Sequence, residues 1–300
     1  MNELMYLGGI LSFRVLQKIS NKAISNDMPG KAHGVSAYLS MSMGMSAAVA
    51  FIFLLFGDAS KDIVSMPPEG WGISVATGVT LTISVTCSLF ALRGSSMVLG
   101  ALFGMAGLLV PIISGIFIFG QSVSPMQWGG ILLLFIAAWL LASSSEKTNG
   151  KLTLKTLFLL LGSMLSNGGT MLLQTLYKHY VPEGNVSLYS FLQFLIPAVT
   201  MLILTFILRA NGKVDRFRPS KKLVIFTAIS AVSLLAISQL STMASAVVPV
   251  AVLFPVSDGG GMIISAIVAS VMYKEKLNIK SVIGISAGIL AIVSMKIFGA

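Results

Sequence analysis

The chain has 300 residues, a mean hydropathy of +0.91 and only 10% charged residues, against roughly 25% in a typical soluble domain. So little charge cannot cover the surface of a water-soluble globule, which excludes a soluble enzyme, a nucleic-acid-binding module and a disordered chain. We assign the net charge of +10 to the loops of a membrane protein and not to a nucleic-acid-binding surface.

Apolar runs of the length of a membrane-spanning helix, about 20 residues, recur along the whole chain. Ten such runs are separated by short linkers that contain Pro, Gly and Asn. In chain order they cover 4–21, 34–57, 71–92, 96–120, 127–145, 156–177, 187–208, 223–242, 246–272 and 281–299. No linker could hold a soluble domain. We therefore expect an all-α polytopic protein of ten transmembrane helices in the plasma membrane or inner cell membrane.

Positive charge is distributed unevenly over the linkers. Of the 20 Lys and Arg residues, 15 lie in the first, third, fifth, seventh and ninth linkers, and three lie in the even-numbered linkers and the termini. The remaining two, Arg14 and Lys18, lie inside the first span. Because basic loops stay on the cytoplasmic side, the odd linkers are predicted to be cytoplasmic and both termini outside.

An internal repeat divides the chain into two halves. Residues 7–12 read LGGILS and residues 161–166 read LGSMLS, at an offset of 154 residues. The same offset pairs Gly130 with Gly284, Ile131 with Ile285, Ala137 with Ala291, and Gln121 with Glu275. We expect two five-helix repeats, 1–150 and 151–300. An odd number of helices per repeat inverts the second copy, an arrangement typical of transporters with a site between the halves.

Three stretches resemble a known family, the EamA-like branch of the drug/metabolite transporter superfamily. Ser95–Ala142 resembles its fourth and fifth helices, Ser257–Gly284 its ninth and tenth, and Gln17–Lys22 the end of its first helix. The resemblance implies a five-plus-five helix fold and export or exchange of small metabolites or drugs through a central cavity. The chain departs from the family at Gln121, where an acidic residue usually closes the fourth helix. It also departs in its charge count, because most members keep both termini in the cytoplasm.

Cations inside the first span are the strongest functional signal. Arg14, Gln17, Lys18 and Asn21 share one helical face, and Arg14 lies roughly 15 Å along the helix, near the middle of a bilayer core of about 30 Å. An intramembrane cation costs about 2.5–3.5 kcal/mol on insertion scales. We expect this face to bind an anionic group such as a carboxylate or phosphate. The structural alternative is that Lys18 reaches the interface and Arg14 forms a static pair.

The sixth span carries a matching polar face, with Asn167, Thr170, Gln174 and Lys178 at helical spacing. The first three are candidate substrate-binding residues opposite the cationic face. The alternative is that they only form hydrogen bonds between helices.

Asp258 is the only acidic residue deep within a span, between Pro255 and a Gly259–Gly261 run. Proline and glycine predict a break with an unwound, ligand-binding segment here. Asp258 is a candidate for proton coupling, for binding a substrate amine, or for the counter-ion of Arg14 or Lys18. Kinks are also expected at Pro111, Pro197, Pro249 and Pro255, with or without a hinge function.

The function expected from these observations is secondary active transport, by alternating access, of a small metabolite that bears an anionic group. An exporter of lipophilic cationic drugs is the first alternative; a membrane scaffold or sensor and a lipid flippase are others. One cysteine, Cys87, and two scattered histidines, His33 and His179, offer no metal site. With no catalytic motif in the spans, we expect no enzyme activity and no cofactor. The expected partners are a small-molecule substrate and the lipid bilayer, with no nucleic acid; the sequence leaves monomer and homodimer open.

Overall fold

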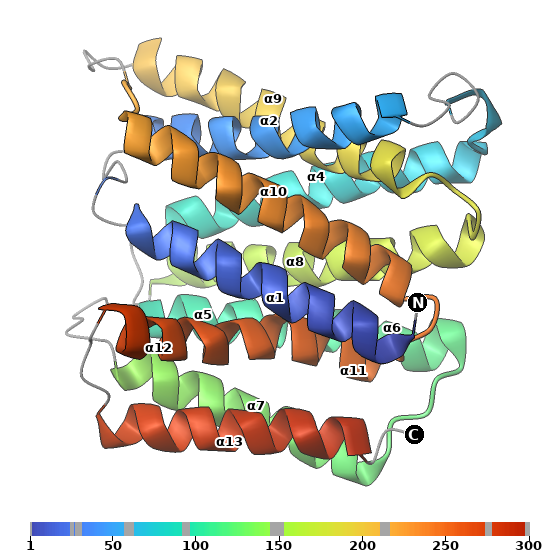
Figure 1. The fold of residues 1–300 in the computed structure, drawn as a ribbon, viewed down its shortest axis with the longest axis vertical. Helices are drawn as coiled ribbons and strands as arrows, with labels where there is room; N and C mark the ends of the chain where they lie inside the picture. Colours follow the sequence, from blue (N-terminus) through green and yellow to red (C-terminus); the bar gives the residue numbers. More distant parts are fainter. Residues whose placement is uncertain are drawn as a thin grey trace.

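The computed structural model describes residues 2–24, 27, 32–56, 63–91, 97–144, 153–210, 217–273 and 278–297, and within these ranges all regular structure is helical (Figure 1). The helices are α1 (Glu3–Ala23), α2 (Ala32–Phe56), α4 (Pro68–Ala91), α5 (Met97–Ala106), α6 (Leu109–Phe119), α7 (Pro125–Ser144), α8 (Leu154–Tyr180), α9 (Val186–Ala210), α10 (Lys221–Ala244), α11 (Val250–Phe254), the π-helical turn η1 (Pro255–Gly259), α12 (Gly260–Tyr273) and α13 (Ile279–Ile297). Each predicted span falls on one helix or on consecutive helices, with ends that differ by a few residues.

The described helices are those of a multi-pass membrane protein. Eight of them, by length and composition, are long and apolar enough to cross a bilayer. Large apolar side chains point outward, such as Phe56 and Phe117, which are 85% and 83% exposed. Hydroxyls such as those of Ser46 and Thr77 are buried, and they donate to carbonyl oxygens of their own helix. This distribution suits a lipid-facing surface and a polar interior. The expectation of an all-α polytopic membrane protein is confirmed at this level.

Helix ends follow from local hydrogen bonds. The hydroxyls of Thr153 and Ser220 accept from the backbone of Thr156 and Leu223, which starts α8 and α10 ahead of the apolar runs. Ser124 and Gln127 exchange side-chain and backbone hydrogen bonds at the start of α7, as in a capping box. Gly120 ends α6 with φ = 61°, a left-handed conformation that favours glycine.

The long helices lie side by side and alternate in direction, with both chain termini at the same end of the bundle (Figure 1). The main helix pairs are α2 with α9, α7 with α13, α1 with α10, and α4 with α8. In the two halves, α1 corresponds to α8 and α4 corresponds to α10. The α1–α10 pair therefore corresponds to the α8–α4 pair. The α1–α12 contact corresponds in the same way to the α8–α6 contact.

Reciprocal glycine contacts occur between α7 and α13. A Cβ on Gly130 would lie 3.1 Å from the carbonyl oxygen of Ala291, and a Cβ on Gly284 would lie 3.2 Å from that of Ala137. These four residues are the pairs that the 154-residue offset relates. When a residue of one half contacts a residue of the other and the equivalent residues contact each other in the reverse sense, the two halves are related by a two-fold axis. The repeat partner Glu275 lies outside the described residues.

Candidate functional site

A cavity of about 320 Å³ is lined by side chains from both halves of the chain. Six of the seven predicted binding residues line it, namely Arg14, Lys18, Asn167, Thr170, Gln174 and Asp258. Apolar side chains, including Met43, Leu81 and Phe194, complete the wall. The volume is at the lower end of the range for small-molecule sites, about 300–1,000 Å³, so the cavity suits a small metabolite.

An ion pair joins α1 to η1 in the wall of this cavity. Arg14 Nη2 donates to Asp258 Oδ1, and it lies 3.1 Å from the hydroxyl oxygen of Ser257. The two charged side chains are only 18% and 25% exposed. Arg14 Nε is buried and has no hydrogen-bond partner among the described residues. Of the roles considered for Asp258, the geometry shows that of counter-ion to Arg14.

The expected break around Asp258 is wrong. The chain remains helical from Val250 to Tyr273, and Pro255–Gly259 form a π-helical turn within it. A π turn accommodates the missing donor and the ring of Pro255 without unwinding, and such turns are frequent at functional sites. It also carries Asp258 toward α1.

The glycines after Asp258 permit close helix packing and do not loosen the helix. A Cβ on Gly259 would lie 2.7 Å from Leu134 Cδ2, and one on Gly260 would lie 2.7 Å from Leu11 Cδ2. A Cβ on Gly261 would lie 3.2 Å from Arg14 Cδ. The Arg14 side chain therefore lies against a helix face that glycine keeps bare.

The actual break lies in the first half, where one continuous span was expected over 96–120. Helix α5 ends at Ala106, Gly107 and Leu108 form a turn, and α6 begins at Leu109. A Cβ on Gly168 would overlap the carbonyl oxygen of Gly107. By the 154-residue offset these two glycines correspond to Arg14 and Gly261. The same junction is thus filled by an arginine in one half and by direct backbone contact in the other.

Lys18 lies one helical turn beyond Arg14 and lines the same cavity. Among the described residues its ammonium has neither a hydrogen-bond partner nor an ion-pair partner within contact distance. The charges that act on it are those of Arg14 and Asp258. Because Asp258 is paired with Arg14, Lys18 is the cation of the cavity that no contacting side chain neutralises in the described part of the chain.

A chain of polar side chains connects three helices on the cavity wall. Gln174 Nε2 donates to Ser238 Oγ at 3.1 Å, and Ser238 Oγ donates to Gln193 Oε1 at 2.8 Å. All three residues line the cavity. On α8 as well, Thr170 Oγ1 lies 3.1 Å from Thr80 Oγ1. The interhelical hydrogen bonds considered for this face are therefore present, at residues that also line the cavity.

Three residues of the two predicted stripes lie away from the cavity. Gln17 is buried, at 8% exposure, but does not line it. Asn21 Oδ1 accepts from Ser230 Oγ at 2.7 Å, which joins α1 to α10. Lys178 lies at the end of α8 and donates to the carbonyl oxygen of Pro182 in the following turn. Each belongs to helix packing or to a helix end.

Sequence reasoning missed Gln193, Ser238 and Ser241, which also line the cavity. Gln193 had a visible signal, since it is an amide within the apolar run Phe191–Leu195. The two serines had none, because serine is frequent in these helices and most of it packs.

The predicted proline kinks differ in outcome. Pro249 is the residue that precedes α11, so it starts a helix and does not kink one. Pro255 opens the π turn. Pro197 lies inside α9, which continues through it. Pro111 lies in the first turn of α6, just after the break at Gly107.

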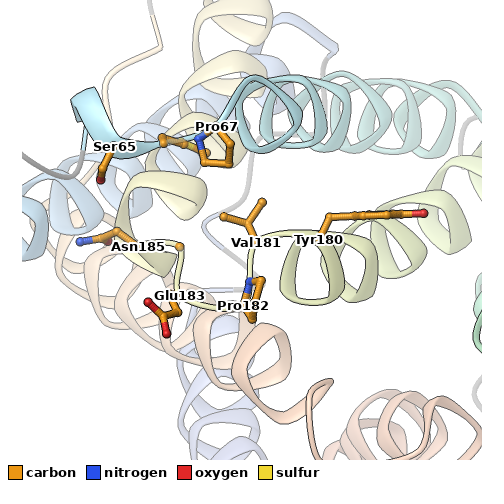
Figure 2. Close-up of a pocket in the computed structure, with 9 residues that line it drawn as sticks. Ser65, Pro67, Tyr180, Val181, Pro182, Glu183 and Asn185 are labelled. Carbon is orange, nitrogen blue, oxygen red and sulfur yellow. The ribbon is translucent and has the colours of Figure 1, made fainter.

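A second cavity, of about 400 Å³, lies at the end of the bundle that holds the two termini. Figure 2 shows Ser65 and Pro67 on one side of it and the turn from Val181 to Asn185 on the other, with Tyr180 directed away. Among the described residues that line it, Glu183 is the charged one. None of the predicted binding residues lies there. Across the described part of the chain, no group of three metal-ligating side chains occurs in either cavity or elsewhere.

Comparison with known proteins supports the fold alone. No family model and no curated protein matches the sequence. A solved structure titled "Crystal structure of protein" has a TM-score of 0.75 over 96% of this chain and 96% of its own, at 10% sequence identity. The arrangement of helices is therefore one that experiment has found in another protein, and the chain shares that fold.

Proposed function

We propose that the chain is a secondary active transporter that exports or exchanges a small metabolite with an anionic group across the cell membrane by alternating access. In this proposal ten helices cross the membrane as two inverted five-helix repeats, and the chain is an EamA-like member of the drug/metabolite transporter superfamily. It acts without a cofactor and without enzyme chemistry. The lipid bilayer and the substrate are its partners.

The reciprocal contacts between Gly130 and Ala291 and between Gly284 and Ala137 support the inverted repeat. A chance sequence offset would not place the same residue pairs in contact twice, in opposite senses. The correspondence between the α1–α10 pair and the α8–α4 pair supports the inverted repeat in the same way. Alternating access requires two such halves around a shared site.

The proposal of an anionic substrate rests on the charge of the cavity that both halves line. Among the described lining residues there are two cations, Arg14 and Lys18, and one acid, Asp258. A drug exporter for lipophilic cations needs a free carboxylate, whereas this carboxylate is held by Arg14. This arrangement of charges therefore favours the binding of anions over the binding of cations.

Ligand binding and flux, measured on the same preparation, test the proposal. Purified protein in detergent is screened by thermal shift against carboxylates, phosphorylated metabolites, amino acids, nucleotides and cationic drugs. A ligand that binds the folded state raises the melting temperature. Uptake of each hit into proteoliposomes is then measured against empty liposomes. Saturable uptake of an anionic hit is the expected result.

Each alternative predicts a different pattern. Stabilisation by lipophilic cations alone, with loss of uptake in Asp258→Asn, indicates a drug exporter. Stabilisation without flux indicates a scaffold or sensor. Movement of labelled lipid between leaflets, without any soluble substrate, indicates a flippase. Any of the three overturns the proposal.

A further inference from the structure

We propose that Lys18 is the residue that binds the anionic group of the substrate and that the cavity is charge-balanced for a single negative charge. The uncharged part of the same molecule binds at the Gln174–Ser238–Gln193 chain. The inference rests on the proposed function, and it names the class of substrate. That class is a small molecule with one carboxylate or similar monoanion and, elsewhere on it, an amide or hydroxyl group.

The charge balance follows from which side chains contact one another. Arg14 and Asp258 are paired, so together they contribute no net charge. Lys18 contributes one positive charge, with no contacting counter-ion in the described part of the chain. A ligand with one negative charge restores neutrality in a site that is largely shielded from water, where an unpaired charge is costly. A dianion leaves the complex negative, and a cation meets Lys18 unopposed.

Arg14 is less suited to bind the anion than the sequence suggested. Its Nη2 is engaged by both Asp258 and Ser257. Its stem lies against Gly261, and its Nε is buried. A substrate anion would have to displace Asp258 to reach the same nitrogen. Arg14 is therefore a positioning residue, which pairs with Asp258 and neutralises its charge.

The location of Lys18 opposes a purely interfacial role. It lies five residues before the end of α1, or roughly 8 Å along the axis, and Lys22 already occupies the last turn. A lysine that only extends to the membrane interface has no reason to line an internal cavity. Lys18 shares that cavity with Arg14, one turn deeper.

Another part of the lining offers neutral hydrogen-bonding groups. In the chain across α8, α10 and α9, the hydroxyl of Ser238 accepts from one amide and donates to the other. The remaining amide hydrogen and oxygen positions of Gln174 and Gln193 serve either donors or acceptors. A neutral amide or hydroxyl of the substrate matches them, and a second carboxylate does not.

Charge-selective modification of a cavity cysteine measures the charge at Lys18 directly. Cys87, the only cysteine, is first replaced by serine. The reporter is Leu234→Cys on α10, which lines the cavity. Two contacts fix the register of α1 against α10, Asn21 with Ser230 and Gly9 with Leu240, and they place Leu234 within about half a helical turn of the level of Lys18. The control is Ser65→Cys, in the second cavity (Figure 2).

Two reagents of opposite charge are compared in detergent-solubilised protein, 2-sulfonatoethyl methanethiosulfonate and 2-(trimethylammonium)ethyl methanethiosulfonate. We expect the anionic reagent to be favoured in the Leu234→Cys reporter relative to the Ser65→Cys control. In Lys18→Gln that preference falls on the order of tenfold, because one nearby positive charge is lost. In the double variant Arg14→Gln with Asp258→Asn it is unchanged, since a neutral pair replaces a neutral pair. Lys18→Met serves if Lys18→Gln does not yield folded protein.

Three results overturn the inference. They are a reporter cysteine that does not react, a preference for the cationic reagent, and an anionic preference that survives the loss of Lys18. These readouts require no transport, so they stand apart from the proposed function. Uptake of succinamide, succinamate and succinate, which carry charges of 0, −1 and −2 on one skeleton, provides the second arm. Succinamate flux that depends on Lys18 supports both proposals. Flux of succinamate or succinate that is indifferent to Lys18 overturns only the inference, whereas flux of succinamide alone contradicts both proposals.

Discussion

Arg14 and Asp258 form an ion pair across the contact between α1 and the π turn η1. Each is the partly buried counter-ion of the other, and Ser257 adds a second acceptor for the same guanidinium nitrogen. The pair has no equivalent in the other half, where the 154-residue offset leads to Gly168 and Gly104. The central cavity is therefore electrically asymmetric although the helices around it are arranged symmetrically.

Removal of one member of this pair is expected to destabilise the fold. Asp258→Ala leaves the Arg14 charge without its anion at a site that is 18% exposed, and we expect the free energy of unfolding to fall by about 2–3 kcal/mol. The double variant Arg14→Gln with Asp258→Asn, which keeps hydrogen-bonding groups but no charge, is expected to lose less. Thermal unfolding in detergent compares the two. Arg14→Gln and Asp258→Asn are also measured singly. If the loss of stability in the double variant equals the sum of the losses in these two single variants, the static pair is contradicted.

The tight contact between α8 and the α5–α6 junction gives a second prediction. A Cβ on Gly168 would overlap the Gly107 carbonyl oxygen and lie 2.6 Å from Val110 Cβ, whereas one on Gly169 meets only Thr80 Cγ2 at 3.7 Å. Gly168→Ala is therefore expected to cost about 2 kcal/mol or more through overpacking. Gly169→Ala is expected to be neutral or slightly stabilising, because alanine favours helix. Equal melting temperatures for the two variants would show that the junction yields easily.

The positions of the helices could be predicted from the sequence because a bilayer sets their length. A run of about 20 apolar residues admits few other structures. The ends differ by a few residues, for instance where capping side chains such as Thr153 and Ser220 start a helix ahead of its apolar run. The cationic face of α1 could be predicted for a similar reason, since a charge in the membrane must find a cavity or a partner.

The local backbone around Asp258 and Gly107 could not be predicted in this way. Glycine and proline mark both segments, and the same residues serve a break, a π turn or a close helix contact. The choice depends on what packs against them. Leu11, Leu134 and Arg14 fill the space beside Gly259–Gly261, and the backbone of α8 lies against Gly107. Partners so distant in sequence leave no local pattern.

The Gln174–Ser238–Gln193 chain is expected to depend on its central hydroxyl. Ser238→Ala leaves a donor of Gln174 and an acceptor of Gln193 unpaired at buried positions, and we expect a loss of about 1–3 kcal/mol in the free energy of unfolding. Ser233→Ala is the matched control on the same helix. Its hydroxyl is buried and bonds only the carbonyl oxygen of Ile229, one turn earlier. A loss at Ser233 as large as at Ser238 would contradict a special role for the chain.

The basic linkers predict the orientation of the protein in its membrane. The linkers with 15 of the 20 Lys and Arg residues follow helices α1, α4, α7, α9 and α12. The C-terminal ends of these helices lie at the end of the bundle opposite the two termini (Figure 1). Insertion retains basic loops in the cytoplasm, so both termini and the second cavity are expected outside.

In the Cys87→Ser background, Ser65→Cys is expected to react with a membrane-impermeant maleimide on intact cells. Pro219→Cys, an exposed position before α10, is expected to react only after permeabilisation. The reverse pattern would place both termini in the cytoplasm, as in most members of the family that the sequence resembles, and would mean that factors other than loop charge decide insertion. Both halves line the cavity that contains Arg14 and Lys18 in either case, so the outcome does not alter the candidate site itself.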